Sequence, residues 1–289
     1  MVDISGFLRT HSFIGSLVVM ALFGLVLYLT SYILVPIILI SLSPISFGLA
    51  LWLNFLIIFG LIAVLFLVII PLLIELPVEK DSYGDYLNAI GLKKLEPKNK
   101  ILKITVISAV TFFIFGFIGS LILGQTVFNF GVLFAWPSPN NLGLFVFIFQ
   151  LRPGIWEEVA FRGVILVLLL QGFRKKSSIF LSGVLFGLMH LLNLIGGASL
   201  LGTIFQVIFA SFLGFLFGYI MTETKNLFPC IILHYLFNVF GNVFFQVSQG
   251  TLFGFIFGLL IIGILTPVII NMIVVKVLMK DESPQGPFD

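Results

Sequence analysis

The chain has 289 residues, of which 60% are hydrophobic and only 9% are charged. A water-soluble domain carries about 25% charged residues, so this composition excludes a soluble globular protein and favours a polytopic membrane protein. The net charge of +3 is too small to indicate a nucleic-acid-binding protein. The single cysteine, Cys230, excludes a disulfide framework and a cysteine-based metal cluster.

The first apolar run is too long for a cleavable signal peptide. It extends from Phe13 to Ile40 and follows Arg9, whereas the apolar region of a signal peptide has about 7 to 15 residues. A cleavage site with two small residues is also missing. We therefore expect this run to be the first membrane helix.

Apolar runs long enough to cross a bilayer core of about 30 Å recur along the chain. The fourth run contains Arg152-Pro153-Gly154, where proline removes a backbone donor, so we expect a break there and a helix that starts near Pro153. The sequence predicts an all-α bundle of about eight transmembrane helices, forming a single integral membrane domain over residues 1–289. Their ranges are 13–41, 46–74, 101–124, 142–173, 178–195, 200–222, 227–246 and 252–277.

Basic residues are concentrated at every second connection between these helices. The connections near 42–45, 125–141, 196–199 and 247–251 have no lysine or arginine. By the positive-inside rule the basic connections are cytoplasmic, which predicts a multi-pass protein of the cell membrane with both termini in the cytoplasm. The residues behind this prediction are Arg9, Lys80, Lys93, Lys94, Lys98, Lys100, Arg174, Lys175, Lys176, Lys225, Lys276 and Lys280.

Residues 75–100 form the only sizeable polar segment, which we expect to be a cytoplasmic loop. Tyr86, Leu87 and Ile90 give it a short apolar stripe beside lysines, as in an amphipathic helix on the membrane surface. A solvated linker fits the same residues. The polar tail at 281–289 is expected to be flexible.

Ionisable residues are rare inside the predicted membrane helices and indicate a function, because a charge at the bilayer centre costs about 3 kcal/mol. With a rise of about 1.5 Å per residue, Glu158 and His190 lie about 24 and 21 Å from the basic loops, and His234 about 13 Å. Residues of the fourth, fifth and seventh helices can therefore meet in a buried polar site. Its candidates are Arg152, Glu157, Glu158, Arg162, His190, His234 and the neighbouring Asn193 and Asn238.

Helical spacing relates several of these side chains. Glu158 and Arg162 are four residues apart, which favours an ion pair; such a pair can serve as a structural clamp alone. Glu157 points about 100° away from Glu158 and is free to face another helix. His234 and Asn238 share a helix face. Arg152, near the outer end of its helix, is expected to snorkel to the membrane surface.

Three short motifs follow one another in the chain. They have the forms E-E-x-x-x-R (157–162), F-x-x-x-H (186–190) and H-x-x-x-N (234–238). In these motifs and their order, about residues 100–250 resemble the protease core of the CPBP family, the membrane proteases that include the type II CAAX prenyl endopeptidases.

The resemblance implies an intramembrane endopeptidase of the glutamate type. Glu157 and His190 would hold and activate a water, His234 and Asn238 would stabilise the oxyanion, and Glu158 with Arg162 would be the supporting ion pair. It implies no metal or other cofactor, membrane lipids as partners, and a peptide or prenylated protein as substrate. We expect cleavage near the cytoplasmic membrane surface.

Three alternatives remain open at this point. Glu157, His190 and His234 have the composition of a zinc site, although the H-E-x-x-H spacing of helical zinc proteases is absent. A catalytically silent scaffold or immunity protein would keep the fold without the reaction. A transporter would use the same polar residues as an ion path.

Overall fold

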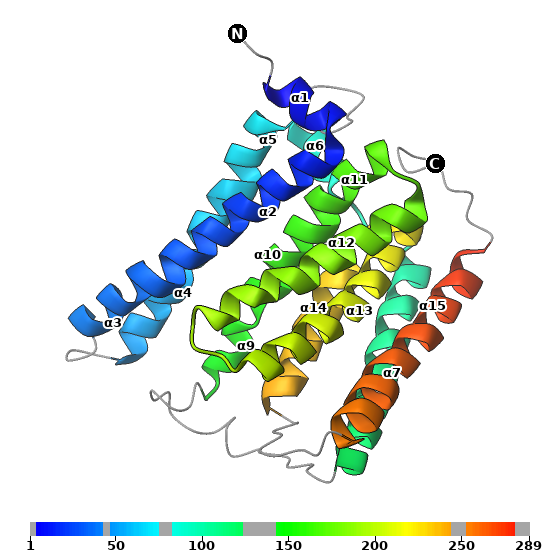
Figure 1. Cartoon of the computed structure of the whole chain (residues 1–289). Helices are drawn as coiled ribbons and strands as arrows, with labels where there is room; N and C mark the ends of the chain where they lie inside the picture. The colour runs from blue at the N-terminus through cyan, green and yellow to red at the C-terminus, as the bar shows by residue number, and fades with distance from the viewer. Residues whose placement is uncertain (1–3, 43–46, 75–82, 124–142, 244–252, 281–289) are drawn as a thin grey trace.

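The computed structural model describes residues 4–42, 47–74, 83–123, 143–243 and 253–280, and these ranges are helical apart from short turns. The helices run side by side as one bundle (Figure 1). Several of them are apolar and long enough to cross a bilayer. The protein is therefore an all-α polytopic membrane protein, as its composition predicts.

The prediction of about eight membrane-crossing helices is not matched exactly in the described ranges. In the described ranges, six helices are long and apolar enough to cross a membrane: Ser12–Ile38, Gly48–Leu73, Lys98–Ile122, Lys175–Leu194, Leu200–Thr224 and Ile256–Met279. The fourth predicted helix carries four charged side chains, and the seventh, α14 (Phe228–Val243), has 16 residues within the described range. Both pack among other helices of the bundle.

The fourth predicted helix consists of consecutive pieces: α9 (Phe145–Phe149), α10 (Leu151–Glu158), the π-helix η3 (Val159–Ile165) and α11 (Leu166–Gly172). The interruption lies at Gln150, three residues before Pro153. The Gly154 N–H donates to the Gln150 carbonyl at 3.2 Å, so the helix continues past the proline. Pro153 falls in the first turn of α10, where a missing N–H is tolerated.

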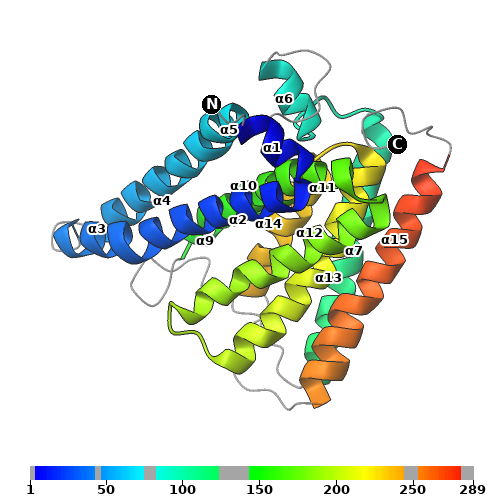
Figure 2. The same cartoon turned by 45° about the horizontal axis from the view of Figure 1, so that its top comes forward.

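The helices form three groups side by side (Figures 1 and 2). On one side, α2 (Ser12–Tyr28), η1 (Leu29–Leu34) and α3 (Val35–Leu42) pair with α4 (Phe47–Val64), η2 (Leu65–Ile69) and α5 (Ile70–Leu73). On the other side, α7 (Lys98–Leu123) packs against η5 (Gly254–Leu265) and α15 (Thr266–Met279). Between them lie α9–α11, α12 (Lys175–Met189), η4 (His190–Leu194), α13 (Leu200–Thr224) and α14. The middle group carries all three motifs.

Paired glycines bring α12 and α13 into close contact. A Cβ added to Gly214 would lie 2.7 Å from the Gly183 Cα and 3.1 Å from the Gly183 carbonyl oxygen. Because these are backbone atoms, a larger residue at Gly214 would push the helices apart. The glycines therefore allow the two helices to pack closely.

The described part of segment 75–100 packs on the bundle itself. Tyr86 of α6 (Tyr83–Ala89) is buried and donates from its hydroxyl to the Phe66 carbonyl at 2.6 Å. Burial raises the pKa of this phenol. The Asn226 side-chain amide donates to the carbonyls of Lys93 and Lys94 at 3.3 and 3.2 Å. These bonds fasten the segment to the turn between α13 and α14. Residues 75–82 and the tail at 281–289 lie outside the described ranges.

The orientation of the bundle can be tested with single cysteines in a Cys230→Ser background. Helix α1 (Ile4–Thr10) begins and α15 ends at one end of the bundle (Figure 1). Ser177, at the start of α12, and Ala198, between η4 and α13, are both exposed. By the positive-inside rule, a cysteine at Ala198 should react with an impermeant maleimide in intact cells, and one at Ser177 only after permeabilisation. The reverse pattern would contradict cytoplasmic termini. The predicted outer loops at 125–141 and 247–251 lie outside the described residues.

Candidate active site

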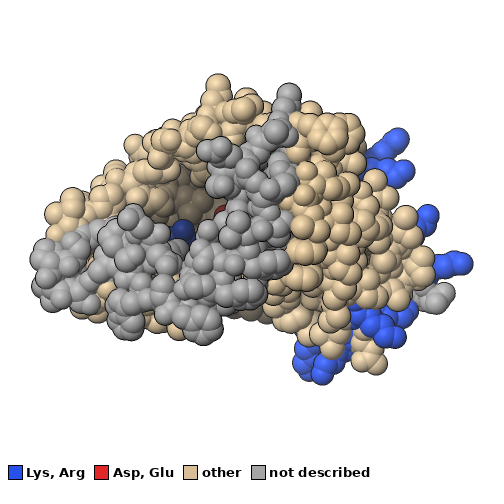
Figure 3. All heavy atoms as spheres, turned by 90° about the horizontal axis from the view of Figure 1, so that it is seen from below, with Lys and Arg blue, Asp and Glu red and all other residues tan. Residues whose placement is uncertain are grey.

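A cavity of about 180 Å³ lies between the α2–α4 pair and the middle helices α10 and α12. Glu157 and His190 both line it, together with Arg152, Ser31, Tyr28, Tyr32 and Asn193. Seen from below, the molecule has a hollow with an acidic and a basic side chain in its depth, while Lys and Arg gather at the far edge (Figure 3). The predicted pair Glu157 and His190 therefore meets in a cavity. Arg152, expected to snorkel to the surface, lines this cavity instead.

The imidazole of His190 has a defined orientation at the junction of α12 and η4. Its Nδ1 lies 3.0 Å from the Phe186 carbonyl oxygen. A carbonyl oxygen can only accept, so Nδ1 donates this hydrogen bond. In the neutral ring the lone pair is then on Nε2. His190 can therefore accept a hydrogen bond from a water in the cavity.

The two neighbouring glutamates occupy unlike environments. The Glu157 side chain is 22% exposed, and its Oε2 lies 3.8 Å from His234 Nε2. The Glu158 side chain is fully buried, and Arg162 Nη1 donates to its Oε1 at 3.1 Å. Glu157 thus reaches the cavity, while Glu158 faces the interior of the protein.

His234 also donates to Glu158, a contact that the sequence did not predict. Its Nδ1 lies 2.7 Å from Glu158 Oε1, the same oxygen that accepts from Arg162. A carboxylate accepts only, so Nδ1 carries the proton and Nε2 is turned toward Glu157. The two residues are 76 positions apart on different helices, so no spacing rule relates them.

Two phenylalanines complete the surroundings of the ion pair. The Arg162 guanidinium carbon lies 4.2 Å from the ring centre of Phe186 and 5.3 Å from that of Phe217. The Phe186 ring also meets the rings of His190 and His234 edge-on, at 5.1 and 5.7 Å between centres. Phe186, the first residue of the F-x-x-x-H motif, thus contacts three site residues at once. Phe217 carries no motif and was missed by the sequence analysis.

The two asparagines have different positions. Asn238 is half-buried on α14, one turn beyond His234, and is not part of the described cavity lining. Its role as an oxyanion donor stays a prediction. Asn193 lines the cavity, and its side-chain amide donates to Gln206 Oε1 at 2.8 Å. This bond joins η4 to α13 and holds the wall of the cavity beside His190.

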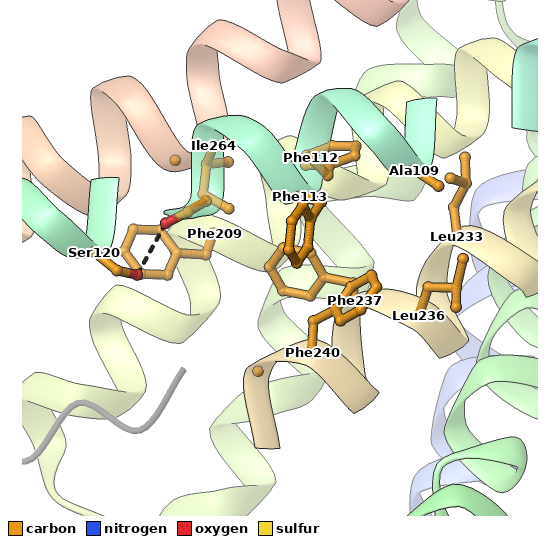
Figure 4. A pocket seen from close by; sticks show the side chains of 13 residues that line it. Ala109, Phe112, Phe113, Ser120, Phe209, Leu233, Leu236, Phe237, Phe240 and Ile264 are labelled. Atoms are coloured by element: carbon orange, nitrogen blue, oxygen red, sulfur yellow. Dashed lines mark hydrogen bonds between the residues drawn. The ribbon is translucent and has the colours of Figure 1, made fainter. Parts of the chain in front are cut away.

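A second cavity of about 190 Å³ lies among α7, α13, α14 and η5 and is lined almost entirely by apolar side chains (Figure 4). Its one hydroxyl, Ser120, donates to the Gly116 carbonyl at 2.9 Å. Leu233, Leu236 and Phe237 of α14 form one wall, whereas His234 points to Glu158. The described lining carries no acid or base, so we assign no catalytic function to this cavity.

A metal triad finds no support in the placement of the side chains. Among the residues that the structure describes, no three histidine, cysteine, aspartate or glutamate side chains converge to hold a metal ion. The expectation that the reaction needs no metal stays a prediction.

Comparison with known proteins places this site in a family. Residues 139–240 match the family model described as type II CAAX prenyl endopeptidase Rce1-like. Residues 139–240 form a CPBP-family domain. The CPBP domain contains all three motifs, so the chain carries a domain of a membrane protease family, which supports a hydrolase that acts on a peptide or protein. No curated protein and no solved structure matches the chain.

We expect Glu158→Gln and Arg162→Leu each to lower the stability of the protein in detergent, because each leaves a buried charge without its partner. Breaking a buried pair costs about 3 to 5 kcal/mol, and the double variant should recover part of the loss. Thermal unfolding and the yield of monodisperse protein measure both effects.

The Lys175–Glu223 pair is a matched control. It has an N–O distance of 2.8 Å, but its side chains are 36% and 24% exposed, and an exposed pair contributes about 0 to 1 kcal/mol. Lys175→Leu and Glu223→Gln should therefore change stability little. Single variants of Glu158 and Arg162 as stable as the wild type would contradict the structural role of their ion pair.

Proposed function

We propose that the CPBP domain is an intramembrane endopeptidase in which Glu157 activates a water to hydrolyse a peptide bond of a membrane-associated substrate. The observation that carries this proposal is the unlike surroundings of the adjacent glutamates. Glu158 is fully buried against Arg162 and His234, whereas Glu157 lines the cavity opposite His190. Two carboxylates in unlike environments can divide the structural and the chemical role.

The geometry suggests a sequence of proton movements. Glu157 takes a proton from a water that also donates to His190 Nε2, and the oxygen forms a bond with the substrate carbonyl carbon. His234 Nε2, 3.8 Å from Glu157 Oε2, can take the proton from the carboxylate. The protonated Nε2 and the Asn238 amide would then donate to the oxyanion. When the C–N bond breaks, the leaving amine takes the proton from His234 Nε2, and the new carboxylic acid loses its proton to Glu157.

An apolar groove supports a substrate that approaches from the lipid. The groove, of about 570 Å³, lies between α2 and the α12–η4 segment, with Met20, Leu25 and Leu188 in its lining. It shares Tyr28, Met189 and Leu192 with the lining of the polar cavity. The apolar part of a prenylated tail or a similar lipid-proximal peptide could lie in the groove while its peptide bond reaches Glu157.

The position of the cavity does not fit the expectation of cleavage near the basic loops. Glu157 lies six residues after Leu151 and fifteen before Gly172, or about 9 Å from one end of its helix and about 22 Å from the basic end. We therefore propose that the bond is cut nearer to the end of the bundle that lies opposite the basic loops. The sequence estimate measured depth from the basic loops alone and had no information on where the cavity opens.

We expect Glu157→Gln to abolish cleavage of a reporter peptide by the purified protein without loss of folding, because the base is removed and the buried pair is kept. His190→Ala should have nearly the same effect, since the water loses its second partner. Asn238→Ala should lower kcat by about 10²-fold or more, the effect of one oxyanion donor. As a control, Glu96→Gln, an exposed position in the polar segment before α7, should leave the rate unchanged.

Two results would contradict this mechanism in different ways. Cleavage by Glu157→Gln at the wild-type rate would remove the glutamate from the reaction. Loss of activity with a chelator and its recovery with zinc would instead make Glu157, His190 and His234 metal ligands. If the wild-type protein cleaves no farnesylated or unprenylated peptide, a silent scaffold becomes the better description.

A further inference from the structure

Arg152 is a charged residue of the cavity that the proposed reaction does not use. It lines the same cavity as Glu157 and His190. It is half-buried and close enough to Glu157 for the two charges to interact. Glu157 is the charged group that interacts with its guanidinium in the described part of the chain. A cation inside a membrane protein is costly unless it is paired, so an anion would bind favourably here.

Two other polar groups of the cavity wall, Tyr32 and Asn193, already have partners in the protein. Tyr32 donates to the Leu192 carbonyl at 3.4 Å, and the Asn193 amide donates to Gln206. Arg162, the other arginine of this helix, is held by Glu158 and two aromatic rings. Of the two arginines on this helix, Arg152 is therefore the one that can meet a ligand in the cavity.

We propose that Arg152 binds a carboxylate of the peptide substrate, either its C-terminal carboxylate or an acidic side chain, close to the bond that is cut. This inference rests on the proposed endopeptidase function. A guanidinium binds a carboxylate through two parallel hydrogen bonds. The five residues from Arg152 to Glu157 correspond to a rise of about 7.5 Å, which an extended peptide spans in about two residues. Substrate binding would also draw Arg152 away from Glu157.

The test compares the binding of three fluorescent peptides that differ only in charge. One ends in a free carboxylate, one in an amide, and one in an amide with an added internal aspartate. Binding is measured on Glu157→Gln protein in nanodiscs of zwitterionic lipid, so no turnover is needed. The peptide whose carboxylate binds Arg152 should have a Kd at least about tenfold lower than that of the neutral amide peptide. Which of the two gains affinity identifies the source of the carboxylate.

Variants of Arg152 then decide whether this residue is responsible. Arg152→Gln in the same background should abolish the difference between charged and neutral peptides, and Arg152→Lys should retain part of it. Arg174→Gln, an exposed position before α12, is the matched control and should change nothing.

Several outcomes would overturn the inference. Equal affinity for all three peptides, or no peptide binding at all, would contradict it. An equal loss of affinity for all peptides in Arg152→Gln would make Arg152 a positioning residue for Glu157. Displacement of the charged peptide by anionic lipid would show that Arg152 binds a lipid headgroup. These are binding results. Failure of the proposed function is recognised separately, by cleavage that persists in the Glu157→Gln protein.

Discussion

One fully buried carboxylate, that of Glu158, holds the site together. Its Oε1 accepts from Arg162 within the same helix and from His234 of α14. Charged groups in a protein interior are stable only with partners, so each of these three side chains requires the other two. The same carboxylate sets the direction of its neighbour, because Glu157 projects about 100° further around the helix. The cavity-facing glutamate is thus a consequence of the buried one.

The buried guanidinium of Arg162 makes fewer hydrogen bonds than it has donors, and aromatic rings surround it. Its Nε and Nη2 have no hydrogen-bond acceptor among the described residues. The faces of Phe186 and Phe217 lie against the guanidinium instead, and cation–π contacts of this kind contribute about 2 kcal/mol when water is excluded. A Cβ at Gly214 would lie 3.3 Å from Nη2, so a glycine on α13 leaves room for the guanidinium. Helices α12 and α13 are therefore fitted to this ion.

The sequence predicted those parts of the molecule that follow from composition or from spacing within one helix. The apolar composition predicted an all-α membrane protein, the three motifs indicated the family, and the spacing of Glu158 and Arg162 indicated an ion pair. Contacts between helices were beyond such rules. The bond from His234 to Glu158 and the position of Phe217 depend on how α10, α12, α13 and α14 pack.

The wrong predictions have a common physical origin. The count of eight crossing helices rested on the length of apolar runs, whereas the charged helix containing Glu158 consists of short pieces and α14 has 16 residues in the described range. Arg152 was expected to snorkel because it lies near a helix end, but α2 and α4 enclose that end in a cavity. The depth of a residue along its helix can be estimated from the sequence, but the side chains of other helices that surround it cannot.

The central claim is that Arg162 and His234 act on the same buried carboxylate. It is tested most directly by a double-mutant cycle on the free energy of unfolding in lipid bicelles, with Arg162→Leu, His234→Ala and the double variant. Because both substitutions remove a donor to Glu158 Oε1, we expect their effects to depart from additivity by about 0.5 to 3 kcal/mol. Strictly additive effects would show that the two side chains act independently and would contradict the shared role of Glu158.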